Sequence, residues 1–400
     1  MLKRIIPILL ALILLGACNT VQIEPTSAPT IEVPTALPTE LPTATTSPTE
    51  VPPPTDIPAA TETSAPIVFG PDNFPANVNP LTGLSVADPS ILERRPVSVK
   101  VQIFPRGQRP PWGVSLADIV YDYYQNNGMT RFHAIFYSNN AEQVGPIRSG
   151  RLFDGNIVSM YNSILAFGGA DSRILNRFFN SDYSDRLVFE GSGNCPPMCR
   201  IDPNGSNFLV ANTQELTTFM TDKGLENGRQ NLNGMTFNSE IPAGGQPVEQ
   251  VLVRFSISAY NRWDLDAATG RYLRFQDAQE AGDFASEVYT PLTDQLTGQQ
   301  IAADNIVILA LPHRYMFKSG NSEIVEIELG TDGSGYAIRD GMIYQIQWNR
   351  PAKDSVLYLT FPDGTPYPYK PGNTWYQIIG ESSTAEAVEN NTWRFTFSIP

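Results

Sequence analysis

A proline- and threonine-rich stretch over residues 19–66 is the feature that most restricts what this chain can fold into. It holds 11 of the 34 prolines, together with twelve Thr, six acidic residues and no Lys or Arg. Proline favours polyproline II, and the stretch has too few apolar groups to offset the entropy of folding. We therefore expect a disordered tether over 18–75, and its 19–66 stretch could extend about 150 Å at ~3.1 Å per residue.

The residues before the tether have the pattern of a secretory signal over 1–17. Lys3 and Arg4 precede an apolar run at 5–15, and small residues follow in LGAC at 15–18. LGAC resembles the bacterial lipobox, which implies that the Cys18 thiol is acylated. The alternative is a plain signal peptide with an incidental cysteine. A lipid anchor would hold the protein at the outer face of the cell membrane, and no later apolar run reaches 18 residues.

The rest of the chain is expected to form two regions of different secondary structure. Strands are predicted at 97–104, 131–137 and 163–167, and helices are predicted at 171–180 and after Asn212, which has Glu215 at capping-box spacing. From residue 249 short strands separated by turn residues are predicted, at 249–258, 305–311, 323–329, 342–348, 356–361, 375–379 and 392–398. We expect an α/β (α+β) domain over 76–235 and a mainly β domain over 245–400.

Arginine is concentrated in the first of these regions. Residues 79–200 hold twelve Lys+Arg and ten Asp+Glu, whereas residues 201–400 hold thirteen and twenty-four. Eleven of the first twelve cations are arginine, whose planar guanidinium suits carboxylate and phosphate groups. A codon bias toward arginine is the alternative explanation. The net charge of −14 and the pI of about 4.6 argue against a general nucleic-acid binder.

The segment GPIRSGR at 145–151 is the leading candidate for a binding site. Arg148 and Arg151 lie three residues apart, and the glycine between them permits a turn that lets both meet one anion. Arg131, at the start of a predicted strand, is a third candidate. Asp118 lies in an apolar run, so we expect it to have a backbone partner or an arginine partner, with these three arginines as the candidates. The four residues could form a fold-stabilising ion-pair network, an anion pocket or a catalytic site.

Two further residues extend this candidate ligand site. His133 shares a strand face with Arg131 by period two, which makes it a pocket member and a candidate general base. The alternative is a strand histidine bonded to a backbone carbonyl. Tyr121 belongs to a group of aromatic residues in the same region, and sugar faces stack on such rings beside cations. Core packing explains at least half of these aromatic residues without a ligand.

Cys195 and Cys199 are the cysteines that remain after lipidation, and outside the cytoplasm we expect them to form a disulfide. Such a short loop gains local rigidity rather than global stability. A redox site would favour Cys-x-x-Cys, and a metal site would need partners that this chain lacks, so no metal is expected. The sequence also lacks a Gly-x-Ser-x-Gly elbow, a His-Glu-x-x-His helix, a Walker loop and a dinucleotide fingerprint.

Several motifs together resemble those of the YerB-like bacterial lipoproteins, which carry a two-part domain of unknown function. They are NPLTG at 79–83, RPV at 95–97, ADIVY at 117–121, GMTRF at 128–132 and GPIRSGR at 145–151. The likeness continues through 298–308, 335–348 and PGNTW at 371–375. The resemblance implies a lipid-anchored envelope protein with two parts, and it implies no reaction.

A looser similarity links the layout to LytR-CpsA-Psr enzymes, which bind polyprenyl pyrophosphate through arginines. The matching elements would be Asp118, Arg148, Arg151 and the pair Gly168–Gly169, with Mg²⁺ held by the aspartate. The leading hypothesis is instead an extracytoplasmic, non-enzymatic protein without a cofactor, which binds an anionic glycan, a wall polymer or an envelope protein partner. The alternatives are an envelope transferase that acts on phosphate-linked polymer and a scaffold with a purely internal Arg/Asp network.

Overall fold

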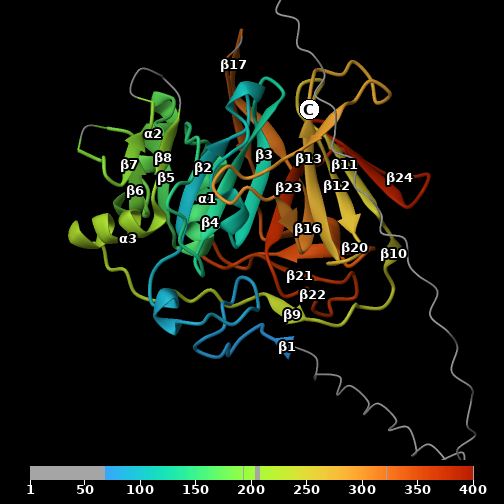
Figure 1. The fold of residues 1–400 in the computed structure, drawn as a ribbon, viewed down its shortest axis with the longest axis horizontal. Helices are drawn as coiled ribbons and strands as arrows, with labels where there is room; N and C mark the ends of the chain where they lie inside the picture. Colours follow the sequence, from blue (N-terminus) through green and yellow to red (C-terminus); the bar gives the residue numbers. More distant parts are fainter. Residues whose placement is uncertain (1–67, 192, 203–207, 321, 400) are drawn as a thin grey trace, which may run out of the picture. The chain divides into compact units, whose positions relative to one another are not determined.

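The computed structural model describes residues 68–191, 193–202, 208–320 and 322–399 (Figure 1). The expected signal peptide, the lipidated Cys18 and the tether as far as residue 67 lie outside the described residues. A compact unit spans Thr63–Pro400. In the described part of this unit, no helix is both long enough and apolar enough to cross a bilayer.

An eleven-stranded mixed sheet is the largest element, and it takes strands from both halves of the unit. In spatial order its strands are β10 (Gln246–Pro247), β20 (Met342–Asn349), β19 (Asp332–Arg339), β16 (Asn305–Leu311), β23 (Thr374–Gly380), β3 (Ile119–Asn126), β4 (Met129–Phe136), β2 (Val97–Gln102), β5 (Ile164–Phe167) and β6 (Leu187–Phe189), with β21 (Tyr358–Thr360) paired to β20. The parallel pair of β23 and β3 joins the two halves at the centre of the sheet.

A second sheet of seven strands is built from the later half alone. Its order is β14 (Tyr289–Pro291), β13 (Arg271–Asp277), β12 (Tyr260–Asp266), β11 (Gln250–Arg254), β25 (Thr392–Thr396) and β24 (Thr384–Val388), and β15 (Ala302–Ala303) pairs with β13. The smaller sheets are β1 (Val68–Phe69) with β9 (Thr236–Asn238) and β22 (Pro368–Tyr369), β17 (His313–Ser319) with β18 (Ser322–Ile327), and β7 (Met198–Arg200) with β8 (Leu209–Ala211).

Three α-helices are described, and all lie in the earlier half: α1 (Leu152–Tyr161), α2 (Ser172–Phe179) and α3 (Thr213–Asp222). The last two begin where the sequence predicts caps. The Asp171 carboxylate accepts from the N–H of Arg173, and the Asn212 side chain accepts from the N–H of Glu215 at 3.0 Å. The helix α1 was not predicted. Eight of its ten residues are buried, so its apolar residues do not follow one face.

The expected fold class, an α/β portion followed by a mainly β portion, is confirmed. The strands β2, β5 and β6 run parallel, and α2 connects β5 to β6. From β9 onward the described residues form strands and no α-helix. The division into domains at 76–235 and 245–400 stays a prediction, although strands from both ranges hydrogen-bond in one sheet.

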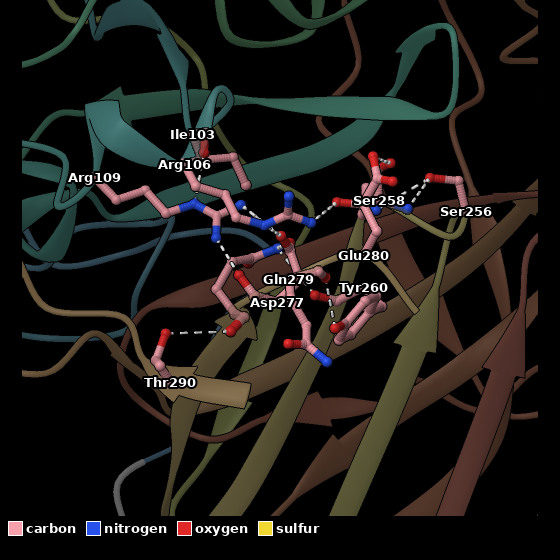
Figure 2. Close-up of polar contacts among 12 residues, drawn as sticks. Ile103, Arg106, Arg109, Ser256, Ser258, Tyr260, Asp277, Gln279, Glu280 and Thr290 are labelled. Atoms are coloured by element: carbon pink, nitrogen blue, oxygen red, sulfur yellow. Dashed lines mark hydrogen bonds and ion pairs between the residues drawn. The ribbon is translucent and has the colours of Figure 1, made fainter. Parts of the chain in front are cut away.

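Aromatic and polar contacts hold the second sheet against the central one. The Trp375 ring on β23 lies 4.9 Å from Phe132 on β4 and 5.1 Å from Trp263 on β12, measured between centroids. Arg106 and Arg109 reach from the earlier half to the second sheet, where both donate to the Asp277 carboxylate (Figure 2). The core therefore runs without interruption from one half of the unit to the other.

Candidate functional site

Two rows of polar and aromatic side chains cross one face of the central sheet. Alternation along each strand and the register between strands place these residues on the same face. The inner row is Lys100 on β2, His133 on β4 and Tyr121 on β3, and the next row is Gln102, Arg131 and Tyr123 on the same strands. The prediction that His133 and Arg131 share a face is confirmed.

The helix α1 brings one carboxylate, Asp154, to this face. The Asp154 carboxylate accepts from the Tyr123 hydroxyl, lies 2.7 Å from His133 Nδ1 and lies 3.3 Å from Lys100 Nζ. It also accepts from the backbone N–H of Arg151 at 2.6 Å, which closes the first turn of the helix. Lys100, His133 and Asp154 are fully buried, so Asp154 is the counter-charge of a buried lysine.

The charges of this buried group are set by burial and by the group's own ion pair. Burial lowers the pKa of Lys100 to about 7, although Asp154 opposes the shift. Burial alone would raise the pKa of Asp154, but Lys100 and hydrogen bonds from His133 and Tyr123 outweigh it and the pKa falls below its usual value. Burial also lowers the pKa of His133. We therefore treat Asp154 as ionised and His133 as neutral near pH 7.

Three arginines lie above this buried group and are partly exposed to solvent: Arg131, Arg148 and Arg151. Arg131 donates to the carbonyl of Ser149 at 3.0 Å, and Arg148 Nε donates to Gln102 at 2.6 Å. Arg151 donates to the carbonyl of Gly150 at 2.9 Å. The structure thus brings together the three arginines that the sequence singled out. We call them the arginine site.

The arginine site lies where two parallel strands end. The N–H of Arg148 bonds to the carbonyl of Lys100 near the end of β2, and the N–H of Gly168, just after β5, bonds to the carbonyl of Arg148. In α/β sheets, ligands bind at the carboxyl ends of parallel strands. Gly169, which leads into α2, has φ +85° and open space where a side chain would be, so the backbone there is accessible.

Neither Arg131 nor Arg151 has a carboxylate at salt-bridge distance in the part of the chain that the structure describes. Neither forms a salt bridge among the described residues, and the Nε atom of each lacks a hydrogen-bond partner there. Burial, followed by repulsion from Arg151 and Arg148, lowers the pKa of Arg131 to about 9. Arg106 and Arg109 differ, because both form ion pairs with Asp277 (Figure 2). Arg131 and Arg151 therefore form no ion pair among the described residues, although the charge of Asp154 favours both protonated guanidinium groups.

The prediction that one of these arginines pairs with Asp118 is wrong. Asp118 precedes β3 and accepts from the N–H groups of Tyr137 and Ser138, from the Ser138 hydroxyl and from Asn79 Nδ2 at 3.0 Å. These donors follow the end of β4, whereas Arg131 lies near its start, about 20 Å away at ~3.4 Å per residue. The expected backbone partner is confirmed. Burial raises the pKa of Asp118.

The remaining predicted residues lie apart from the arginines or outside the described chain. Tyr121 is buried, its hydroxyl lies 2.7 Å from that of Tyr161, and its ring stacks on Tyr376 at 4.6 Å. Its role as a ligand contact stays a prediction. The disulfide between Cys195 and Cys199 is confirmed, with 4.8 Å between the Cα atoms.

Sequence reasoning missed Lys100 and Asp154, although a signal for each was present. Lys100 is the one charged residue in the apolar strand VSVKVQ, which is the same pattern that drew attention to Asp118. Asp154 follows Arg151 at the spacing of a capping box, but the helix was not predicted. Among the described residues, no group of three or more His, Cys, Asp or Glu is arranged to hold a metal ion.

Comparison with known proteins gives one consistent match. Residues 81–226 match the model described as "Protein of unknown function (DUF3048) N-terminal domain", and residues 251–376 match the corresponding C-terminal domain. The chain is 27% identical over 311 residues to "Putative lipoprotein YerB" of Bacillus subtilis (strain 168), covering 76% of this chain and 87% of that protein. The crystal structure of YerB from Bacillus subtilis superimposes with a TM-score of 0.62 at 26% identity, covering 76% of this chain and 96% of that chain.

The fold and the arginine site define a two-part protein in which an α/β half and a β half share one sheet. The N-terminal family model matches the earlier half of the chain, and the C-terminal family model matches the later half. The chain belongs to the YerB-like family with N- and C-terminal DUF3048 domains.

Proposed function

We propose that this protein is a lipid-anchored protein of the bacterial cell envelope that binds an anionic glycan, a wall polymer or an acidic envelope partner through the arginine site. The LGAC motif at 15–18 and a relative named as a lipoprotein support the anchor and an extracytoplasmic location. The binding function is carried by one observation: Arg131 and Arg151 donate to the adjacent carbonyls of Ser149 and Gly150, and neither forms a salt bridge in the described chain.

The physical argument starts from the cost of placing like charges together. A partly buried guanidinium is stabilised when an acceptor of opposite charge forms an ion pair with it, as Asp277 does with Arg109. Asp154 cannot do so for the arginines, because its oxygens already accept from Lys100, His133, Tyr123 and a backbone N–H. A phosphate or similar anion at the ends of β2 and β5 would supply that charge, and arginine binds such groups with paired hydrogen bonds.

The two alternatives receive less support. In the transferase hypothesis Asp118 holds Mg²⁺ beside the arginines, but Asp118 lies at the other end of β4 with its oxygens bonded to protein groups. In the scaffold hypothesis the arginines form an internal Arg/Asp network, but Arg131 and Arg151 lack that aspartate and reach solvent. The anion-binding proposal explains both features.

The test is a thermal-shift series on the full-length protein in detergent with sulfate, phosphate, pyrophosphate and a poly(glycerol phosphate), each with and without Mg²⁺. An anion at a hundred times its dissociation constant should add about 2.7 kcal/mol of stability. Arg131→Met and Arg151→Met should remove the shift, whereas Arg262→Met should keep it, because Arg262 pairs with Asp264 in the second sheet. No shift with any anion, or an equal shift in all three variants, would refute the proposal.

A further inference from the structure

Two neighbouring cavities in the later half are unrelated to the arginine site. The first, of about 480 Å³, lies against β16, β19, β20 and the segment that follows β23. The second, of about 380 Å³, lies where β16 and β20 end and β19 begins. They share Ala310, Ser334 and Glu381, so together they form one groove, which we call the β19 groove. Each volume is within the ~300–1,000 Å³ typical of ligand sites.

The floor of the β19 groove is formed by polar side chains that have no hydrogen-bond partner among the described residues. Tyr336 lies directly across from Gln345, and Ser334 lies directly across from Gln347, on adjacent strands. None of these four side chains forms a hydrogen bond among the described residues, and neither does the Glu381 carboxylate. Ser334, Gln345, Gln347 and Glu381 are exposed. Ordered strands therefore hold several free donors and acceptors at fixed spacing in a concave surface.

The groove exists because the second sheet stops short of β20. Tyr336 is covered on one side by Trp393 and Phe395 of β25, each at 5.4 Å between ring centroids. The second sheet ends one strand later, at β24, whose residues are mostly exposed. Gln345 and Gln347 of β20 line the same cavity as Ala385 of β24.

A buried tryptophan lines the smaller cavity from the other face of β20, because Trp348 follows Gln347 and the two side chains point to opposite sides of the strand. Trp348 lines the smaller cavity and is 2% exposed, yet its indole Nε1 has no hydrogen-bond partner among the described residues. A buried N–H without an acceptor is unfavourable and is usually satisfied in native proteins. Gly333, across the strand pair, has no side chain that could supply one, and any Cβ there would collide with the indole ring.

The charge of the groove determines the kind of ligand. Its lining includes Glu328, Asp332 and Glu381 but no Lys or Arg, so an anion would be repelled. Carboxamides and hydroxyls both donate and accept hydrogen bonds, which matches sugar hydroxyls and acetamido groups. An aromatic ring beside them offers a surface on which a sugar face can stack. An added peptide strand would need free backbone groups, whereas β19 is paired on both sides.

We propose that the β19 groove binds a neutral oligosaccharide with hydroxyl and acetamido groups, held by Gln345, Gln347 and Tyr336. This site is separate from the arginine site and does not depend on an anion binding there. The protein would thus recognise a glycan through a neutral surface on its β half, whatever the arginine site binds.

The test is calorimetric titration of the full-length protein, in a detergent without sugar groups, with the tetrasaccharide of N-acetylglucosamine. Maltotetraose, which lacks acetamido groups, is the comparison ligand. We expect binding of the first with Kd on the order of 1 mM or tighter, accompanied by a change in tryptophan fluorescence. The double variant Gln345→Ala/Gln347→Ala should weaken it at least about tenfold, which is ~1.4 kcal/mol.

The matched control is Gln299→Ala, an exposed glutamine that does not line the groove. It should bind as the unaltered protein does, and all variants should melt at similar temperatures because the side chains are exposed. Arg151→Met should also bind normally, which separates this proposal from the anion site. No heat at about 10 mM of either sugar, or equal affinity in the Gln345/Gln347 variant, would overturn the proposal.

Discussion

Arg274 Nη2 lies 2.8 Å from the Asp122 carboxylate, and both side chains are completely buried between the two sheets. Arg274 belongs to β13, in the second sheet, and Asp122 to β3, at the centre of the first. The guanidinium is also within 4.8 Å of the Trp263 ring centroid and donates to Gln276 at 2.8 Å. This ion pair joins the half that carries the arginine site to the half that carries the β19 groove.

Asp122→Asn should therefore be strongly destabilising. Removing one partner of a buried ion pair leaves an uncompensated charge, and the expected loss is about 3–5 kcal/mol in the free energy of unfolding. Urea denaturation monitored by tryptophan fluorescence would measure it. The control is Arg314→Met, which removes an exposed pair with Glu328 and should cost less than about 1 kcal/mol. Equal losses in the two variants would show that the buried pair does not couple the sheets.

Arg151→Met and Arg131→Met should leave the unliganded protein as stable as before or slightly more stable. Each removes a cation that forms no salt bridge among the described residues, while methionine keeps much of the side-chain volume. Arg109→Met should do the opposite, because it leaves the buried Asp277 carboxylate with one guanidinium fewer. The measurement is the thermal midpoint of each variant without added anion.

The outcome distinguishes a binding site from a structural network. If the Arg131 and Arg151 variants lose several kcal/mol as the Arg109 variant does, the arginines act through protein contacts and the proposed anion is unnecessary. If they gain stability and lose the shift caused by pyrophosphate, the arginines are kept for a ligand at a cost to the free protein.

Much of the secondary structure can be predicted from local sequence patterns, because runs of β-branched residues indicate strands. The strand predicted at 305–311 has those bounds in the structure. The predicted helix cap at Asn212 is also observed, because its side chain accepts from the N–H of Glu215. The long-range relationships do not follow. Nothing near Asp122 in the sequence indicates Arg274, since the partners are 152 positions apart and meet only when two sheets pack.

The candidate site was predictable to a similar degree. Three arginines in two short motifs can be recognised from their spacing, and they do gather at the ends of β2 and β5. The predicted pairing of one of these arginines with Asp118 was wrong. A carboxylate in an apolar run can accept hydrogen bonds from several kinds of donor, and Asp118 accepts them from backbone N–H groups that follow β4. The β19 groove had no sequence signal, because Gln345 and Gln347 read as ordinary exposed positions of a strand.

Loss of the Cys195–Cys199 disulfide should have a small effect on global stability. The bond spans a sequence separation of 4, and the entropy of closing so short a loop corresponds to about 2 kcal/mol. Cys195→Ser/Cys199→Ser should lower the free energy of unfolding by no more than that. Limited proteolysis should cut the variant faster near residue 195 than elsewhere. A loss much above about 3 kcal/mol would mean that the loop supports the fold beyond its own segment.

Sulfate affinity at the arginine site should fall as pH rises. Sulfate keeps its charge over this range, so any change reports on the protein. Lys100, with a pKa of about 7, and Arg131, with a pKa of about 9, both lose positive charge as pH increases. A bound anion favours their protonated forms, so binding takes up protons above pH 7 and weakens by the same linkage. Calorimetry at about pH 6, 8 and 9.5 would measure the affinity.

The variant Lys100→Met separates the effect of deprotonating Lys100 from that of deprotonating Arg131. It removes the group that titrates near pH 7, so the affinity of this variant should change little between about pH 6 and 8 and should still fall toward pH 9.5 because of Arg131. The substitution also leaves Asp154 without its lysine, so the melting temperature must be followed in parallel and titrations restricted to temperatures at which the variant is folded. An affinity for sulfate that is independent of pH in the unaltered protein would show that the anion does not sense these two groups, and would place it away from β2 and β4.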